Sequence, residues 1–339
     1  MLINEWIEGV LEPIKNEIEL IQEHLVQIDN QLREYQQKLD LDYKNRLFTV
    51  EKNTRNNNTE LEKILQELTG RADKVVELEK KLDTSLIQCA KTLVEQRKKR
   101  ENFDKEPYTE NIKTKESTYY QIDYFDFENH FRGSREDIKK RQSIYIPFFK
   151  DKTEVIDLGC GRGEFLELMK ENNINAIGVD SYSEFVEYCK LKGLNVIESD
   201  AISYIKNTTS ISGIFAGQLV EHLTIEQIIE LYEIIYDKLE IGGCFIIETP
   251  NPTSLAIYTH AFYIDPSHNK PIHPLTLQYI AQKAGFKEME ILYTEESKIP
   301  FCIPKLEGNT ENINSFNESM KEVQNMLFGS QDYALIARK

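Results

Sequence analysis

One segment constrains this chain more than any other: an apolar strand pattern that leads directly into a glycine-rich loop and the start of a helix. The segment reads Val155-Ile156-Asp157-Leu158-Gly159-Cys160-Gly161-Arg162-Gly163-Glu164-Phe165. Glycine is required where the backbone turns sharply and approaches a ligand closely, because a Cβ atom would clash. A dinucleotide fingerprint, G-x-G-x-x-G, would have its third glycine at position 164, whereas here it is Gly163. The preceding Asp157 disfavours a pyrophosphate, so the loop predicts a nucleoside ligand with a zwitterionic tail.

An acidic residue follows each of the next two predicted strands. Asp180 ends the run Ile177-Gly178-Val179-Asp180, and Asp200 stands in Ser199-Asp200-Ala201. A carboxylate at the end of the second strand can accept hydrogen bonds from both ribose hydroxyls. The carboxylate after the third strand can accept one from an adenine amino group. Each Asp alone is also a common helix cap. Together with the glycine loop, the two acids predict S-adenosylmethionine as the cofactor.

From about Thr153 onward the chain alternates short β-branched runs with amphipathic helical patterns. We expect strands at 154–158, 176–179, 194–197, 213–217, 243–248, 287–293 and 332–338. We expect helices near 163–172, 182–192, 201–206, 224–239 and 274–284. This alternation is typical of βαβ units and predicts an α/β fold, a seven-stranded Rossmann-like parallel sheet with helices on both faces. A polar insert, rather than a regular crossover, separates the last two strands.

The N-terminal part carries a different, strictly helical pattern. Apolar residues recur at steps of four and three, at Ile3, Ile7, Leu11, Ile14, Ile18, Ile21, Leu25, Ile28, Leu32, Tyr35 and Leu39. Such a period of about 3.5 residues is the requirement for a coiled coil, and Leu at a with Ile at d favours three or four strands. A helix of about 48 residues would be about 70 Å long, too long for one globule to cover. We therefore favour self-association through this coil, as a trimer or tetramer, over helices packed on the chain's own globular domain.

A second helical stretch, from about Thr59 to Arg100, has a less regular seam. Its apolar positions are Leu61, Leu65, Leu68, Ala72, Val75, Leu78, Leu82, Leu86, Cys89 and Leu93. Residues 52–59 between the two stretches are all polar and include three consecutive asparagines, a residue that favours turns yet is tolerated in coils. Either the chain turns back as an antiparallel hairpin, or one long coil has a polar interruption.

The pattern changes along the chain predict its domain layout. We expect a coiled-coil oligomerisation region at 1–105, a linker at 106–118 and a globular domain at 119–339. Within that domain we expect an N-terminal lid (119–150), a core (153–294), an insert (295–330) and a last strand (331–339).

Composition and charge exclude several classes of protein. Lys and Arg number 41 and Asp and Glu 57, and the net charge of −16 argues against a nucleic-acid partner. No apolar run is long enough for a membrane span, and the N-terminus lacks the pattern of a signal peptide. The five cysteines show no CxxC spacing, so neither a zinc site nor a disulfide framework is indicated. We expect a reduced, cytoplasmic protein.

From about Tyr120 onward the chain resembles class I S-adenosylmethionine-dependent methyltransferases, through D-x-G-x-G-x-G at 157–163, Asp180 and Asp200-Ala201. Further segments resemble bacterial methyltransferases of surface-polysaccharide synthesis: Phe131-Arg132-Gly133-Ser134, Gln218-Leu219-Val220-Glu221-His222-Leu223, Glu248-Thr249-Pro250-Asn251-Pro252, Phe262-Tyr263-Ile264-Asp265-Pro266-Ser267-His268 and Pro271-Ile272-His273-Pro274. The resemblance implies O-methylation of a sugar in an O-antigen or capsule-type glycan, capping the chain, with a coil that sets oligomeric state or reach. It also implies polysaccharide-assembly proteins as partners, which would hold the enzyme at the inner face of the membrane.

Two other functions stay open at this point. Glu221-His222 also resembles small-molecule methyltransferases, so a quinone-like or nucleotide-sugar acceptor is the alternative to a glycan. The third interpretation is a scaffold whose coil assembles a complex while the globular domain only binds the cofactor.

The expected cofactor-binding residues are Arg132, Asp157, Gly159, Cys160, Gly161, Gly163, Asp180, Ser181, Asp200, Ala201, Gln218 and Glu221. Arg132 would pair with the methionine carboxylate, or form only a surface salt bridge. His222 is the first candidate for the base that deprotonates the acceptor, unless it only packs against the cofactor. Asp265, His268 and His273 form a second catalytic group, for substrate binding or proton removal. The same set suits a divalent metal or plain loop structure, and spacing alone assigns no metal ligand.

Overall fold

The computed structural model describes residues 2–53, 58–103, 123–260, 262–308 and 312–339. The chain divides into two compact units, Met1–Glu106 and Pro107–Lys339, and each is described by itself. The predicted linker at 106–118 lies outside the described residues. Among those that are described, no helix combines the length and the apolar character that crossing a bilayer requires.

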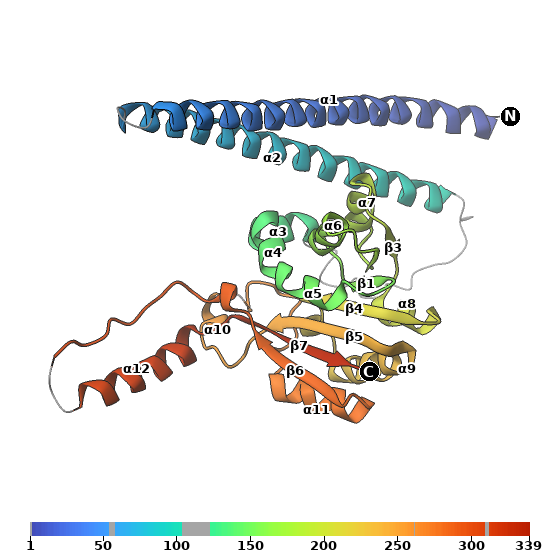
Figure 1. Cartoon of the computed structure of the whole chain (residues 1–339). Coiled ribbons are helices and arrows are strands. Elements are labelled where there is room, and N and C mark those ends of the chain that lie inside the picture. The colour runs from blue at the N-terminus through green and yellow to red at the C-terminus, as the bar shows by residue number, and fades with distance from the viewer. Residues whose placement is uncertain (1, 54–57, 104–122, 261, 309–311) are drawn as a thin grey trace. The chain divides into compact units, whose positions relative to one another are not determined.

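The first unit consists of two long helices, α1 (Leu2–Asn53) and α2 (Asn58–Phe103), which run side by side (Figure 1). Ion pairs join them, among them Arg46 with Glu67 at 2.7 Å and Arg71 with Asp42 at 3.1 Å. A step of four residues forward in α1 therefore corresponds to a step of four backward in α2. Of the two arrangements that the sequence left open, the helices form the antiparallel hairpin.

Side chains of the predicted seam differ in burial along the hairpin. Leu32 and Leu78 are buried, and Ile18, Ile21, Leu25 and Ile28 are half-buried. Leu65, by contrast, is 65% exposed, so this position of the second seam does not pack within the described hairpin. Self-association of this unit, with three or four copies, stays a prediction.

The second unit is built on one seven-stranded mixed sheet, which confirms the predicted Rossmann-like fold (Figure 1). Its strands are β1 (Val155–Leu158), β2 (Ala176–Asp180), β3 (Val196–Glu198), β4 (Ile211–Gly217), β5 (Leu239–Pro250), β6 (Glu288–Tyr293) and β7 (Asp332–Arg338). The order is β3-β2-β1-β4-β5-β7-β6. The first five strands pair in parallel, as expected, but β7 lies antiparallel between β5 and β6. The expectation of a wholly parallel sheet is wrong for this strand, because the insert brings the chain back at the opposite end.

Helices cover both faces of the sheet, since its central strands are apolar on both sides. All four residues of β1 and all seven of β4 are buried. One core cluster joins the sheet to α8 (Ala201–Asn207), α9 (Ile225–Lys238) and α11 (Pro274–Ala284). The other joins it to η2 (Ser143–Tyr145), α5 (Ile146–Phe149) and α6 (Glu164–Glu171). The remaining crossover helix, α7 (Ser183–Leu191), contacts β2 and β3.

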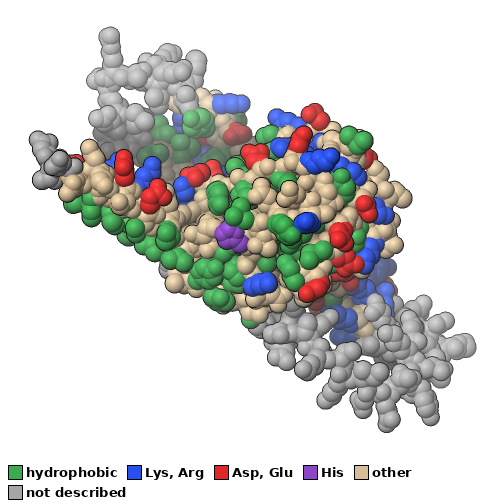
Figure 2. Space-filling view, turned by 90° about the horizontal axis from the view of Figure 1, so that it is seen from below, with side chains coloured by type: hydrophobic (Ala, Val, Ile, Leu, Met, Phe, Trp, Pro, Cys, Tyr) green, Lys and Arg blue, Asp and Glu red, His purple; other side chains and the backbone are tan. Residues whose placement is uncertain are grey.

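Several helices of this unit were not predicted. The expected lid contains α3 (Tyr124–Phe131) and α4 (Arg135–Gln142), in addition to η2 and α5. Short turns form η3 (Val220–His222), η4 (Glu295–Ser297) and α10 (Ile257–His260). The expected insert contains α12 (Ile313–Phe328), none of whose residues is buried. On the face shown in Figure 2, apolar, acidic and basic side chains are interspersed.

Candidate active site

The glycine loop between β1 and α6 adopts the backbone that only glycine accepts readily. Gly159, Gly161 and Gly163 have φ of 71°, 49° and 77°. A Cβ atom on Gly163 would lie 2.8 Å from Leu194 Cδ1 and 2.9 Å from Cys189 Sγ, so the loop also packs tightly against these two side chains. Glycine is therefore needed here for its backbone conformation and for the close approach of neighbouring atoms.

Two of the predicted acids lie at this loop. Asp157 is 2% exposed, burial raises the pKa of its carboxyl well above the ordinary range, and its Oδ2 has no hydrogen-bond partner within the described structure. Asp180 accepts hydrogen bonds from the backbone N–H groups of Gly161, at 2.9 Å, and Tyr182, at 2.8 Å. Burial raises the pKa of Asp180, and the two hydrogen bonds oppose that shift. The loop and the end of β2 thus form one structural unit.

The other predicted residues at this edge are more exposed. Asp200 is exposed and caps α8 by accepting a hydrogen bond from the N–H of Ser203 at 2.9 Å. Ala201 is the first residue of that helix, and Ser181 is exposed immediately after β2. The structure therefore gives Asp200 the capping role that the sequence allowed, while its contact with an adenine stays a prediction.

Arginines of the lid and the glycine loop lie close together. Arg132 ends α3, forms an ion pair with Glu128 at 2.9 Å, and its Nη1 would be 3.6 Å from a Cβ on Gly161. Arg162 binds the lid through Asn129 Oδ1 at 3.0 Å and pairs with Glu164 at 2.7 Å. Sequence reasoning missed the role of Arg162, which is 3% exposed although it lies within a polar loop. Its side chain fixes α3 beside the glycine loop.

A second group of polar side chains lies beyond the end of β4, in and around η3. Gln218 has a left-handed φ of 56° and donates from Nε2 to Asp332 Oδ1 at 3.1 Å. Glu221 is completely buried, and its Oε2 accepts a hydrogen bond from Thr249 Oγ1 at 2.9 Å. Its Oε1 has no hydrogen-bond partner among the residues described, and burial raises the pKa of this carboxyl to about 8.

A hydrogen-bonded chain of three residues fixes the tautomer of His222. Ser267 Oγ donates to Asp265 Oδ1 at 2.5 Å and lies 2.9 Å from His222 Nδ1. Because a hydroxyl has one proton, Ser267 must accept from His222, so the imidazole proton is on Nδ1 and the lone pair is on Nε2. Burial, together with the nearby His268, lowers the pKa of His222 to about 4. The ring is therefore neutral near pH 7.

Asp265 is the last acceptor in this series of hydrogen bonds, and it also contacts the lid. Its Oδ2 accepts a hydrogen bond from Tyr124 Oη at 2.8 Å, and its Oδ1 accepts one from the Ser267 N–H at 2.8 Å. Burial raises the pKa of Asp265, but the hydrogen bonds from Ser267 and Tyr124 outweigh it and bring the pKa below its ordinary value. The carboxylate is ionised at neutral pH and holds the proton of Ser267 in place.

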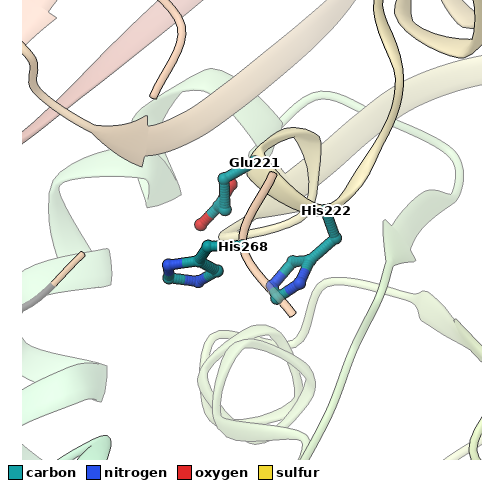
Figure 3. A group of neighbouring side chains, drawn as sticks. All are labelled: Glu221, His222 and His268. Atoms are coloured by element: carbon teal, nitrogen blue, oxygen red, sulfur yellow. The ribbon is translucent and has the colours of Figure 1, made fainter. Parts of the chain in front are cut away.

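His268 lies beside His222, with ring centroids 4.7 Å apart and an interplanar angle of 65°. Its Nδ1 is 2.7 Å from the carbonyl oxygen of Phe262, which can only accept, so Nδ1 carries the proton. Glu221, His222 and His268 each have one nitrogen or oxygen atom within 4.8 Å of the others, and Figure 3 shows the carboxylate of Glu221 pointing toward the His268 ring.

The structure rearranges the second predicted catalytic group. Asp265 and His268 lie together, with His268 Nε2 3.9 Å from Asp265 Oδ2. His273, however, is exposed and caps α11, accepting a hydrogen bond from the N–H of Leu275 at 3.2 Å. Glu221, which the sequence assigned to the cofactor, lies in the histidine group in its place. Ser267 was missed, and its only sequence signal is its position two residues after Asp265, where a short side chain can turn back.

Comparison with known proteins decides the family. A crystal structure of an S-adenosylmethionine-dependent methyltransferase from Archaeoglobus fulgidus is 44% identical, with a TM-score of 0.61, and the match covers 64% of this chain and 99% of that one. The chain belongs to the S-adenosylmethionine-dependent methyltransferases. A family described as methionine biosynthesis protein MetW matches residues 137–259. A search of curated proteins found no match.

Two further structures are more distant. An S-adenosylmethionine-dependent methyltransferase from Thermotoga maritima has 14% identity and a TM-score of 0.44, with 65% of this chain and 97% of that one covered. A phosphoethanolamine N-methyltransferase from Haemonchus contortus has 15% identity and a TM-score of 0.47, with 66% and 58% covered.

The methyltransferase takes S-adenosylmethionine as its cofactor, and the loop after β1 fits that molecule. Three glycines leave every second position of the loop without a side chain, and Asp157 presents a buried carboxylate oxygen that lacks a hydrogen-bond partner in the described structure. Such an oxygen suits the ammonium group of an amino acid, because burying an unpartnered polar atom is costly. The cofactor supplies a methyl group on a positively charged sulfur.

Proposed function

We propose that this methyltransferase transfers the methyl group to a sugar hydroxyl of a bacterial surface glycan. Methyl transfer to a hydroxyl requires the loss of a proton, so an O-methyltransferase benefits from a base near the acceptor. The observation that carries the proposal is the chain from Asp265 through Ser267 to His222, which holds a neutral imidazole with its lone pair on Nε2.

The residues at the carboxyl ends of the strands divide into two sets in this proposal. Asp180 accepts the ribose hydroxyls, Asp157 faces the ammonium group and Arg132 pairs with the carboxylate of the cofactor. The His222 group receives the acceptor. Leu219 connects the two sets, since a Cβ on Gly159 would lie 3.1 Å from its Cδ1 and Glu221 is only two residues further along the chain. The histidine group thus begins directly beside the glycine loop.

Alignment and exclusion of water would supply most of the rate enhancement, since the reaction is an in-line displacement. Tyr124 of the lid donates a hydrogen bond to Asp265, so the lid is linked to the hydrogen bonds that orient His222. Movement of α3 would therefore change the support of His222 at the same time as it opens or covers the cofactor.

The glycan acceptor rests on the narrower sequence resemblance, together with a base suited to a hydroxyl. In this proposal the methyl group caps the growing chain, and the helical hairpin sets the oligomeric state or the reach of the catalytic unit. A small molecule, such as a quinone-like compound or a nucleotide-linked sugar, is the alternative acceptor. The Glu221-His222 pair would serve a small acceptor as well as a glycan.

Acceptor profiling tests the proposal. The full chain is incubated with methyl-labelled S-adenosylmethionine and, separately, with surface glycan, free sugars, nucleotide sugars and quinone precursors. Label on glycan, accompanied by loss of the same methyl group from cells that lack the gene, is the expected result. Label confined to free small acceptors would eliminate the glycan proposal, and label on none of them in an otherwise cofactor-binding protein would favour a scaffold.

A further inference from the structure

Methyl transfer that relies on a single base does not require Glu221, His222 and His268 to lie together. Three side chains with metal-ligand chemistry converge on one point, from η3 and from the loop before α11 (Figure 3). Glu221 is completely buried, yet within the described structure its Oε1 accepts no hydrogen bond. A buried carboxylate oxygen without a partner is costly and indicates that a ligand completes the site.

The hydrogen bonds around the group prepare its atoms for coordination. His268 Nδ1 donates to the Phe262 carbonyl oxygen at 2.7 Å, and His222 Nδ1 donates to Ser267 Oγ at 2.9 Å. In its neutral form each imidazole therefore carries the lone pair on Nε2. The remaining oxygen of Glu221 is held by Thr249 Oγ1 at 2.9 Å. Metal-binding histidines almost always donate their other ring N–H to a carbonyl, carboxylate or similar acceptor, which fixes tautomer and orientation.

We propose that Glu221, His222 and His268 bind a divalent transition-metal ion. Two imidazole nitrogens and one carboxylate oxygen suit zinc or another first-row ion, whereas magnesium and calcium prefer oxygen ligands throughout. Ligand atoms of a tetrahedral zinc ion lie about 3.4 Å apart. One ligand atom of each side chain lies within 4.8 Å of the others, so binding of the ion would draw these atoms together by up to about 1.4 Å. Asp265, whose Oδ2 is 3.9 Å from His268 Nε2, adds negative charge beside the site.

The existence of this site is independent of the proposed function, but the role given to the ion rests on that function. Three protein ligands leave at least one position for the acceptor, as in catalytic zinc sites. A hydroxyl bound there is acidified by the ion and loses its proton to solvent. The oxygen then attacks the methyl carbon, the bond from carbon to sulfur breaks, and the sulfur keeps the electron pair. In that state His222 is a ligand and does not take the proton itself.

Metal binding can be measured without any acceptor. The full chain, carrying Cys302→Ser because that exposed thiol would also bind metals, is dialysed against a chelator and titrated with Co²⁺, followed by displacement with Zn²⁺. We expect one equivalent of Co²⁺ with an absorption spectrum of nitrogen and oxygen ligands. Glu221→Gln and His268→Gln should each weaken binding by at least about tenfold, and Ser267→Ala by about tenfold to a hundredfold.

The matched control is His24→Gln, which removes an exposed histidine from α1 and should leave Co²⁺ affinity unchanged. Near-ultraviolet circular dichroism and cofactor affinity establish that each variant is folded. The absence of stoichiometric Co²⁺ binding, or undiminished binding by a folded Glu221→Gln variant, overturns the proposed site.

Activity measurements separate the site from the function. If the ion binds but the chelated enzyme methylates glycan at the full rate, the role of the ion is overturned and His222 is the base. If the ion binds and glycan is never labelled, the glycan acceptor fails while the metal site stands.

Discussion

Substituting Gly163 by alanine should destabilise the second unit by about 2–4 kcal/mol. The residue has φ of 77°, and the left-handed region costs a residue with a Cβ about 1–2 kcal/mol. The added carbon would lie 2.8 Å from Leu194 Cδ1 and 2.9 Å from Cys189 Sγ, and overpacking of this kind costs about 1–3 kcal/mol. Alanine also restricts the unfolded chain, which returns about 0.4–1 kcal/mol.

Gly242→Ala is the matched control for this substitution. Gly242 has a nearly identical φ of 80°, but no atom lies within 4 Å of a Cβ placed on it. It should therefore show the backbone cost alone, about 1 kcal/mol after the effect on the unfolded chain. The difference between the two variants measures the overpacking directly. In the double variant with Leu194→Ala, the clash with Leu194 is removed, so part of the cost of Gly163→Ala should disappear.

Urea unfolding of the full chain, followed by near-ultraviolet circular dichroism, measures these differences as shifts of the midpoint at constant m. Equal destabilisation by the two alanines would refute the argument from packing. A Gly163→Ala variant as stable as the native chain would refute the argument from backbone conformation as well.

Three further predictions concern the cofactor, pH and the hairpin. Asp180→Ala should weaken cofactor binding by about 1–3 kcal/mol, measured by calorimetry, because it removes the acceptor of the ribose hydroxyls and of the Gly161 N–H; unchanged affinity would remove that assignment. Burial raises the pKa of Glu248 from 4.5 to about 7, so the native state binds more protons than the unfolded state between these values and the free energy of unfolding falls as pH rises through them. Glu248 should contribute at most about 3 kcal/mol of that fall, so the fall should be smaller in Glu248→Gln, while Glu221, whose pKa is also raised, keeps its own contribution; an identical pH profile in the variant would contradict the prediction. Light scattering should give the full chain a mass of at least two chains and residues 110–339 the mass of a monomer; a full chain that stays monomeric at micromolar concentration would defeat the prediction.

The sheet was predictable because its strands are short apolar runs between turn residues. All seven predicted strands overlap the observed ones, and the helix expected at 274–284 coincides with α11. The direction of β7 could not be predicted, because it depends on where the insert returns the chain rather than on the residues of the strand. The helix α12 was missed for a related reason: it has no buried residue, so no core requirement marks its pattern.

The candidate site shows the same division between local and long-range information. The left-handed glycines and the acid at the end of β2 follow from local sequence, because each is dictated by a single turn or strand end. The grouping of Glu221 with His268 depends on a contact across 47 residues, which no spacing reveals. Sequence spacing instead joined His273 to His268, but a proline at position 274 starts α11 and turns His273 into its cap.

The hairpin changes the reasoning behind self-association without removing it. The sequence argument assumed that one seam needs a partner chain, whereas α2 already lies along α1. Two helices can cover only one side of each other, however, and the described part of the hairpin leaves large apolar side chains more than half exposed: Leu20, Val26, Leu41, Leu65 and Val76. Exposed apolar groups on both helices of a hairpin favour the pairing of hairpins into a bundle of four or more helices. The number of chains in the assembly is then set by how many hairpins close that bundle, and no longer by the residues at a and d of a single coil.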